Sequence, residues 1–188
     1  AAGRADVDPY PGRLSRPYVL TTAGGGSDGG PLVESAASAR VPAGHDHIVV
    51  AGPQLAEDRF ARAQALAGPS TTVVRSCPGL AHRIREAAVV AMGGYNTVCE
   101  ILATSTPALI VPREKPRLEQ AIRARALSRA SAVDTARQEA ATPDLLSRWL
   151  AGAVSTRTDR SRVELGGLAA AARAAARLLT RTPEGELT

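Results

Sequence analysis

The stretch Met92-Gly93-Gly94-Tyr95-Asn96-Thr97-Val98-Cys99-Glu100 joins an apolar segment to an amphipathic one. Residues 87–91, directly before it, read Ala-Ala-Val-Val-Ala, and a short apolar run of this kind is typical of a buried parallel strand. Val98, Ile101 and Leu102 then recur at helical spacing, so Gly93-Gly94 marks a strand-to-helix turn. Glycines let backbone N–H groups approach a ligand closely, and the new helix adds unpaired donors and the positive end of its dipole. The stretch therefore predicts an anion site suited to a phosphate.

Glu100 lies one turn into this helix, and its position allows two interpretations. Its carboxylate can accept hydrogen bonds from two vicinal hydroxyls, such as those of a ribose next to a diphosphate. Alternatively, Thr97-Val98-Cys99-Glu100 fits a capping box, in which Glu100 bonds back to the start of the helix. The stretch alone leaves both interpretations open.

A second glycine-rich turn follows the first expected strand. Residues 18–22 read Tyr-Val-Leu-Thr-Thr, and five glycines occur between them and the helical pattern that begins at Pro31. Proline is favoured at the first position of a helix. A flexible surface loop is the alternative, but five glycines between a strand and a proline-started helix favour a second phosphate-binding turn.

Strands and helices alternate along the rest of the chain. This alternation predicts an α/β, Rossmann-like domain of three layers, with helices on both faces of a mainly parallel sheet of about six strands. Ligands of such sheets bind beyond the carboxyl ends of the strands, so the two glycine turns and the loops at 77–79 and 112–118 should face one crevice. The other expected strands are residues 47–50, 71–74, 108–111 and 132–134. The other expected helices are 56–66, 80–86, 117–130 (with Leu118, Ile122 and Ala126 on one face), 143–154 and 168–179.

The expected domain spans residues 17–180. Residues 1–16 hold Pro9, Pro11 and scattered charge and read as a linker or interdomain arm, and residues 181–188 read as a tail. Residues 157–162 are polar and loop-like. The alanine-rich segment 168–179 has apolar faces that would need a partner surface.

Composition narrows the function classes. The net charge is +5 and the pI is near 10, which raises nucleic acid as a partner. However, no five-residue basic run occurs and aromatics make up only 3%, so we expect no nucleic acid. The charge suits an anionic small molecule or, as a peripheral contact, an anionic membrane surface.

The cysteines and histidines indicate no metal site. Cys77 and Cys99 lack metal-ligand spacing, which favours a reduced, cytoplasmic setting. His45 and His47 lack suitably spaced cysteine or carboxylate partners, so we expect them to be surface residues at a strand entry. His82 is expected to be structural. No apolar run reaches 18 residues, so no spanning helix is expected.

Residues 92–102 and 107–113 together resemble the signature of family 28 of the GT-B glycosyltransferases. This family includes the enzyme that adds N-acetylglucosamine to lipid I, and the resemblance is closest to a branch of predicted bacterial glycosyltransferases. Residues 25–29 are similar to the family's glycine loop, and Glu119-Gln120 stands where the family has a polar pair facing the sugar. Ser105 and Ala88 depart from the family pattern outside the proposed diphosphate site. The resemblance covers about residues 17–180 and implies the C-terminal, donor-binding half of a GT-B fold.

The resemblance implies an inverting, metal-independent transfer of a sugar from a nucleotide-diphosphate sugar, foremost a UDP-sugar, to an unknown acceptor. No cofactor is implied, because the nucleotide-sugar is a substrate. The implied contacts are Gly25, Gly26, Ser27, Asp28, Gly29, Gly94, Tyr95, Asn96 and Thr97 to the diphosphate, Glu100 to the ribose, Cys77 and Leu80 to the nucleobase, and Arg113, Glu119 and Gln120 to the sugar.

The resemblance places the catalytic base in an N-terminal, acceptor-binding domain or subunit. We therefore expect this chain alone to bind a nucleotide-sugar and barely to transfer it. Three alternatives stay open. They are a naturally split transferase, a GT-B-like nucleotide-sugar hydrolase or 2-epimerase, and a non-catalytic nucleotide-binding module.

Overall fold

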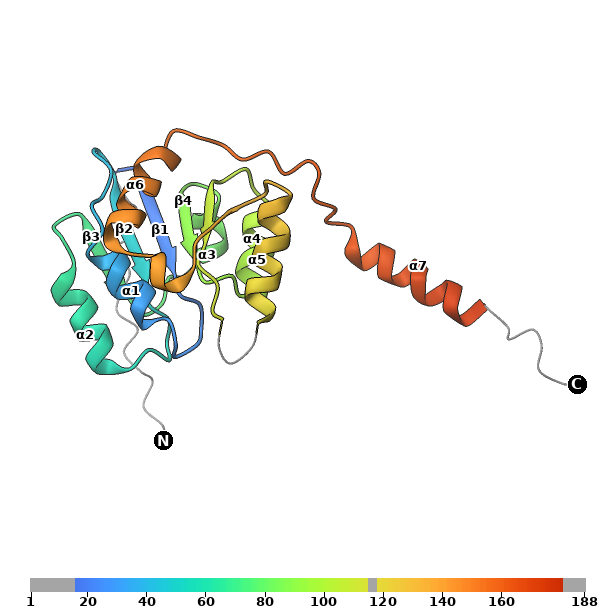
Figure 1. Cartoon of the computed structure of the whole chain (residues 1–188), viewed down its shortest axis with the longest axis horizontal. Coiled ribbons are helices and arrows are strands. Elements are labelled where there is room, and N and C mark those ends of the chain that lie inside the picture. The colour runs from blue at the N-terminus through green and yellow to red at the C-terminus, as the bar shows by residue number, and fades with distance from the viewer. Residues whose placement is uncertain (1–15, 115–117, 181–188) are drawn as a thin grey trace, which may run out of the picture.

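Six short segments form one parallel sheet in the computed structural model, which describes residues 16–114 and 118–180 (Figure 1). The expected linker, apart from Arg16, the expected tail and part of the expected 112–118 loop lie outside the described residues. The strand order is β3-β2-β1-β4-β5-β6. The strands are β1 (Tyr18–Thr22), β2 (Asp46–Val50), β3 (Thr71–Val74), β4 (Ala88–Ala91), β5 (Ala108–Ile110) and β6 (Asp134–Thr135). The expected strands are confirmed within one residue at each end, except that β6 begins two residues later.

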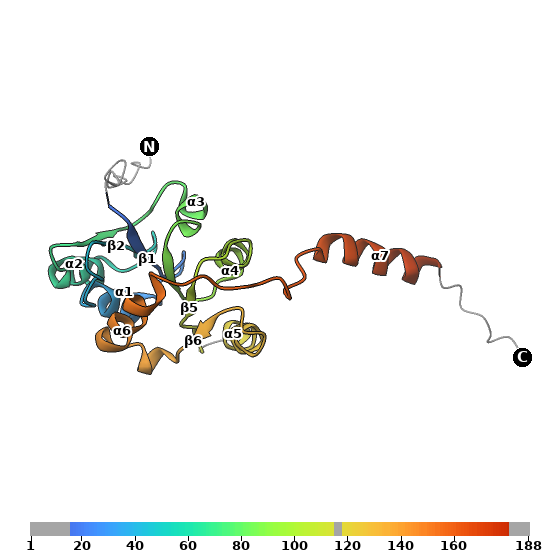
Figure 2. The ribbon, with the colours of Figure 1, turned by 90° about the horizontal axis from the view of Figure 1, so that it is seen from above.

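Helices cover both faces of the sheet, which confirms the expected three-layer architecture (Figure 2). One face carries α1 (Gly30–Ala37), α2 (Glu57–Leu66) and α6 (Pro143–Ala153), and the other carries α3 (Leu80–Ile84), α4 (Tyr95–Leu102) and α5 (Glu119–Arg129). A 3-10 turn at Gln138–Ala140 precedes α6. Because successive strand residues point to opposite faces, each strand contributes to both cores. Val19 and Leu20 of β1, for example, are fully buried in different cores.

The strand order reverses between β1 and β4. The chain passes from β1 outward to β2 and β3, then returns to place β4 against the other side of β1, where Thr22 pairs with Ala91. In open parallel sheets, the crevice at such a reversal is the usual ligand site. The two glycine-rich turns follow these two neighbouring strands, so the fold brings them side by side.

His47 is buried, so its expected position at the surface is wrong. Its side chain is 1% exposed, and its Nε2 lies 2.8 Å from Thr21 Oγ1. His47 shares a strand face with Val49, which points into the core beneath α1 and α2. The hydroxyl of Thr21 supplies the polar partner that lets an imidazole occupy this position.

The face of α5 that carries Leu118 and Ile122 does not lie against the core. Leu118 and Ile122 are 59% and 64% exposed. The helix instead buries Ala121 and Ala124. Small alanine side chains let a helix approach a sheet closely, so the larger residues lie on the outer side.

The segment after α6 runs back along the domain before α7 (Gly167–Thr180) extends away from it (Figures 1 and 2). Thr158 N donates to Ser105 O at 2.8 Å. The expected loop at 157–162 is confirmed as irregular, yet Arg160 within it is only 8% exposed. Residues 170–177 of α7 are exposed. In the described part of the chain, no helix has both the length and the apolar character needed to cross a bilayer.

Candidate functional site

A cavity of about 200 Å³ lies where β1 and β4 end. Both glycine-rich turns line it, and two further side chains come from the loop after β5 and the start of α5. The lining residues are Thr22, Ala23, Gly24, Gly25, Gly26, Asp28, Met92, Gly93, Gly94, Thr97, Arg113 and Gln120. A crevice therefore exists at the strand-order reversal between the two glycine turns, but the loop at 77–79, which was expected to face it, does not line it. The cavity brings together seven of the residues implied by the resemblance.

Glycine is required in these turns by backbone shape and by close packing. Gly24 and Gly93 have φ angles of +77° and +82°, which disfavour other residues. A Cβ on Gly93 would lie 2.7 Å from Ile110 Cγ2. Gly52, after β2, has φ of +89°, and a Cβ there would lie 2.1 Å from Gly24 O. Gly52 thus makes room for the turn that forms the cavity wall.

The start of α4 offers unpaired backbone donors at the cavity. The helix begins at Tyr95 with Gly94 as its N-cap, and its first internal bond runs from Val98 N to Gly94 O at 3.0 Å. The N–H groups of Tyr95, Asn96 and Thr97 therefore have no acceptor within the helix. Together with the positive end of the helix dipole, they can bind an anion.

The start of α1 offers fewer groups to a bound anion than the sequence predicted. Gly29 is buried, and a Cβ there would lie 2.3 Å from Ala23 Cβ, so this glycine serves close packing. Pro31 has no N–H to donate. Ser27 is exposed and does not line the cavity. The part of this turn that lines the cavity is therefore its first half, residues 24–26, together with Asp28.

Asp28, Arg113 and Gln120 form a polar network in the cavity wall. Arg113 Nη1 lies 2.9 Å from Asp28 Oδ2, and the Arg113 backbone N–H donates to Gln120 Oε1 at 3.1 Å. Arg113 Nε is buried and has no hydrogen-bond acceptor among the described residues. A buried donor without an acceptor is unfavourable, so this arginine is held in the cavity wall at a cost in stability.

Glu100 is half-buried and makes no hydrogen bond or ion pair with the described residues. The capping-box interpretation is wrong, because α4 begins at Tyr95 and Thr97 is already its third residue. No side chain caps this helix. Glu100 does not line the cavity, and it leaves an unpaired carboxylate one turn along α4.

The remaining residues implied by the resemblance lie outside the cavity. Cys77 and Leu80 follow β3, at the sheet edge beyond β2, and pack on the core. Burial raises the pKa of the Cys77 thiol. Tyr95, Asn96 and Glu119 are exposed at the starts of α4 and α5. Their roles in binding base, phosphate or sugar stay predictions.

The contacts implied by the resemblance do not include Thr22, Gly24, Met92 and Gly93, which also line the cavity. Thr22 Oγ1 accepts a hydrogen bond from Gly24 N at 3.3 Å and so helps to shape the turn. The available signal was position, because each of these residues directly follows or ends a strand that leads into a glycine turn.

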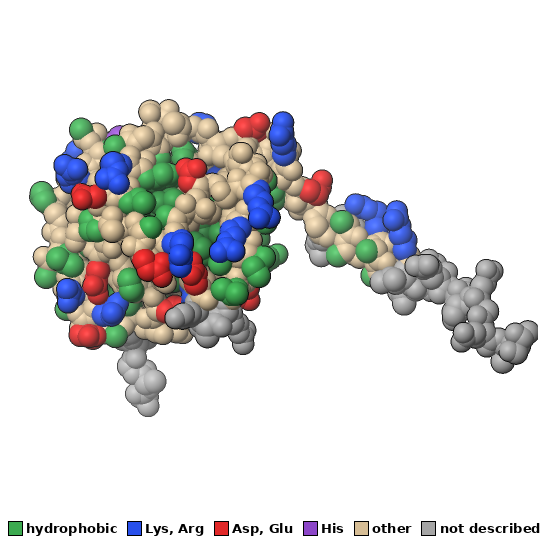
Figure 3. Space-filling model, viewed as in Figure 1, with side chains coloured by type: hydrophobic (Ala, Val, Ile, Leu, Met, Phe, Trp, Pro, Cys, Tyr) green, Lys and Arg blue, Asp and Glu red, His purple; other side chains and the backbone are tan. Residues whose placement is uncertain are grey.

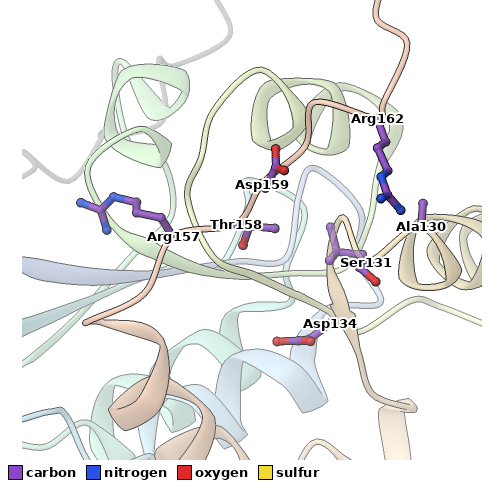
Figure 4. A pocket seen from close by; sticks show the side chains of 8 residues that line it. Ala130, Ser131, Asp134, Arg157, Thr158, Asp159 and Arg162 are labelled. Carbon is purple, nitrogen blue, oxygen red and sulfur yellow. The ribbon is translucent and has the colours of Figure 1, made fainter.

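A larger cavity of about 420 Å³ lies near the start of β6, the strand at the edge of the sheet far from β3 (Figure 4). It has no glycine turn or helix N-terminus among its lining residues. Asp134 in it accepts a hydrogen bond from Trp149 Nε1 at 2.7 Å, and Arg157 extends away from the other labelled side chains. Within residues 16–114 and 118–180, no cluster of three or more metal-ligating side chains occurs.

No protein-family model matches the chain, and no curated protein sequence matches it significantly. Several solved structures match the chain. MurG from Acinetobacter baumannii is 22% identical with a TM-score of 0.61, and the match covers 85% of this chain and 50% of MurG. CalG4, the calicheamicin glycosyltransferase, is 18% identical with a TM-score of 0.59, covering 78% of this chain and 37% of CalG4.

The glycosyltransferase VinC, crystallised with dTDP, is 20% identical with a TM-score of 0.54, and the match covers 75% of this chain and 34% of VinC. The chain therefore spans half or less of the length of these three structures. At such identities the comparison shows the fold. That fold is a Rossmann-like α/β domain matching the C-terminal half of GT-B glycosyltransferases.

Proposed function

We propose that this chain is the donor-binding half of an inverting, metal-independent glycosyltransferase of family 28, which takes its sugar from a UDP-sugar. The observation that carries the proposal is the cavity between the two glycine turns at the reversal of strand order. The fold shared with MurG, CalG4 and VinC supports it, as does the dTDP bound to VinC.

The cavity suits the leaving group of such a reaction. As the sugar–oxygen bond breaks, negative charge develops on the diphosphate, and fixed donors aimed at that charge lower the barrier. The N–H groups at the start of α4, the helix dipole and the Arg113 guanidinium supply such donors without a metal. Glu100, one turn further on, is free to accept hydrogen bonds from the ribose hydroxyls.

The proposal assigns the acceptor and the catalytic base to a second domain or subunit. Within the described cavity wall, Asp28 is the only carboxylate, and it is held by Arg113. Large apolar side chains are exposed at the neighbouring starts of α4 and α5, where Tyr95 is 68% and Ile122 64% exposed. Arg123 joins these two ends, lying 5.4 Å from the Tyr95 ring centroid and donating to Gly93 O at 3.0 Å.

We place the working protein in the cytoplasm, in peripheral contact with a membrane and without nucleic acid as a partner. On the face shown in Figure 3, acidic and basic side chains are interspersed, which suits a small anionic ligand better than a polyanion.

The test is calorimetric titration of the chain with UDP and UDP-hexoses, with magnesium and with a chelator. We expect binding of equal strength in both conditions. Gly94→Ala should weaken it about ten-fold or more, because the new methyl group would enter the cavity and displace the ligand by part of an ångström. The stability of the Gly94→Ala variant should hardly change, since a Cβ on Gly94 meets no atom within 4 Å.

Gly68→Ala is the matched control. Its Cβ also meets no atom within 4 Å, but Gly68 lies between α2 and β3, away from the cavity. Strict magnesium dependence would overturn metal independence. Equal binding of UDP and every UDP-hexose, with no activity after a candidate acceptor domain is added, would favour the non-catalytic module. Release of free sugar without an acceptor would favour the hydrolase.

A further inference from the structure

Asp28 supplies the only carboxylate among the described residues that line the cavity. Its Oδ2 lies 2.9 Å from Arg113 Nη1. Its other oxygen, Oδ1, lies over the glycine turn, where a Cβ on Gly26 would come within 2.8 Å of it. The carboxylate is 38% exposed and the Arg113 side chain 27%. The pair therefore stands in the cavity wall and is partly open to a ligand.

A carboxylate in this position discriminates between ligand groups. An ionised carboxylate only accepts hydrogen bonds, and so does a fully ionised terminal phosphate, so the two repel and cannot bond to each other. A sugar hydroxyl, in contrast, can donate to Asp28. Arg113 completes the arrangement, because its Nη1 lies on Asp28 while the guanidinium, with its side chain 27% exposed, keeps a positive charge beside the place where a phosphate would bind.

We infer that Asp28 is a specificity residue, which makes the cavity prefer a diphosphate whose terminal phosphate carries a sugar over the free nucleoside diphosphate. This inference rests on the proposed function and moves Asp28 from the diphosphate to the sugar end of the site. Gln120, which accepts a hydrogen bond from the Arg113 backbone, belongs to the same end. In a transfer reaction, Asp28 then disfavours the diphosphate product and helps it to leave.

The experiment measures affinities for UDP, its β-methyl ester and UDP-glucose at pH 8, where the terminal phosphate of UDP carries its second charge. In Asp28→Asn, the side-chain amide oxygen can still accept from Arg113, while the negative charge is gone. UDP should bind about ten-fold tighter to this variant, and UDP-glucose should change by less than about three-fold. The ratio of the two affinities is the readout.

Glu114→Gln is the matched control, because Glu114 adjoins Arg113 in sequence and pairs with Arg137 at 3.2 Å outside the cavity. This substitution removes one negative charge and should shift the affinities for UDP and UDP-glucose equally. The unmodified protein gives a second measurement that needs no variant: the β-methyl ester, with one charge less, should bind more tightly than UDP.

Equal shifts for UDP and UDP-glucose in Asp28→Asn, or tighter binding of UDP than of its methyl ester by the unmodified chain, would overturn the inference. In either case the proposed function would stand, because both ligands would still bind. If neither UDP nor UDP-glucose binds the unmodified chain, the proposed function itself fails.

Discussion

Thr21 and His47 face each other between β1 and β2, with 2.8 Å between the hydroxyl oxygen and Nε2 of the ring. The other ring nitrogen, Nδ1, is buried and has no hydrogen-bond partner among the described residues. Burial lowers the pKa of His47 from its usual 6.5 to about 4. Protonation would place an unpaired charge in the core beneath α1 and α2, so the native state holds this imidazole neutral.

The stability of the domain should therefore depend on pH through His47. Above pH 6.5 the ring is neutral in both the folded and the unfolded chain, and its effect on stability is full. Between pH 6.5 and about 4 only the unfolded chain binds the proton, so stability falls as the pH falls. The whole effect is roughly 3 kcal/mol. Urea denaturation at a series of pH values measures it.

His47→Gln is the variant that isolates this effect, because its amide can bond to Thr21 and does not titrate. The difference between the two proteins in unfolding free energy should shrink by about 1 kcal/mol or more from pH 7 to pH 5. His45→Gln, at a partly exposed residue of the same strand entry, should leave the pH dependence unchanged. Parallel curves for all three proteins would contradict the assignment to His47.

Arg160 should be the most important charged residue for stability in the segment after α6. Its guanidinium donates to the backbone carbonyls of Ala132, Thr104 and Thr106 at 2.8, 2.7 and 2.7 Å. Arg160→Met would leave these oxygens without their charged donor, and we expect destabilisation on the order of 3–5 kcal/mol. Arg162→Met, at an exposed arginine of the same segment, should change the unfolding free energy by less than about 0.5 kcal/mol.

Local patterns predicted the sheet and the turns, but not which side each residue faces. The alternation of short apolar runs with helical segments was enough to predict six strands, three layers and the meeting of both glycine turns. His47 was predicted to lie at the surface, and residues 157–162 were predicted only as a polar loop. The partners that bury His47 and Arg160, Thr21 and three backbone carbonyls, are distant in sequence. Ile122 was predicted to share one helix face with Leu118, but this face is exposed. Hydrophobicity alone does not reveal that alanines give the closer fit of α5 to the sheet.

In the candidate site, too, the sequence predicted the local backbone features but not the long-range side-chain contacts. Glycine spacing predicted the cavity walls, since φ above zero and close backbone approach demand glycine. The pairing of Asp28 with Arg113 joins residues 85 positions apart, and no local pattern predicts it. Tertiary contacts of this kind decide which side chains in a predicted turn remain open to a ligand.

Glu100→Gln should weaken binding of UDP by roughly 1.5–3 kcal/mol, because the ribose hydroxyls would lose a charged acceptor. Its melting temperature should stay the same, since Glu100 caps no helix and pairs with no described residue. The unmodified chain should bind 2′-deoxy-UDP more weakly than UDP, and the variant should bind the two alike. Cys99→Ser, at the preceding exposed residue of α4, is the control and should leave both affinities unchanged.

Gly52→Ala should harm both stability and ligand binding, although Gly52 does not line the cavity. The new Cβ would lie 2.1 Å from Gly24 O, so the glycine turn after β1 would have to shift. Gly44→Ala separates this clash from backbone strain, because Gly44 has a similar φ of +76° but a Cβ there meets nothing within 4 Å. We expect Gly44→Ala to lower the unfolding free energy by about 1 kcal/mol and to leave UDP affinity unchanged. Gly52→Ala should destabilise by about 1–3 kcal/mol more and weaken UDP binding at least several-fold. Equal UDP affinities in the two variants, measured on folded protein, would show that the position of Gly24 does not govern the anion site.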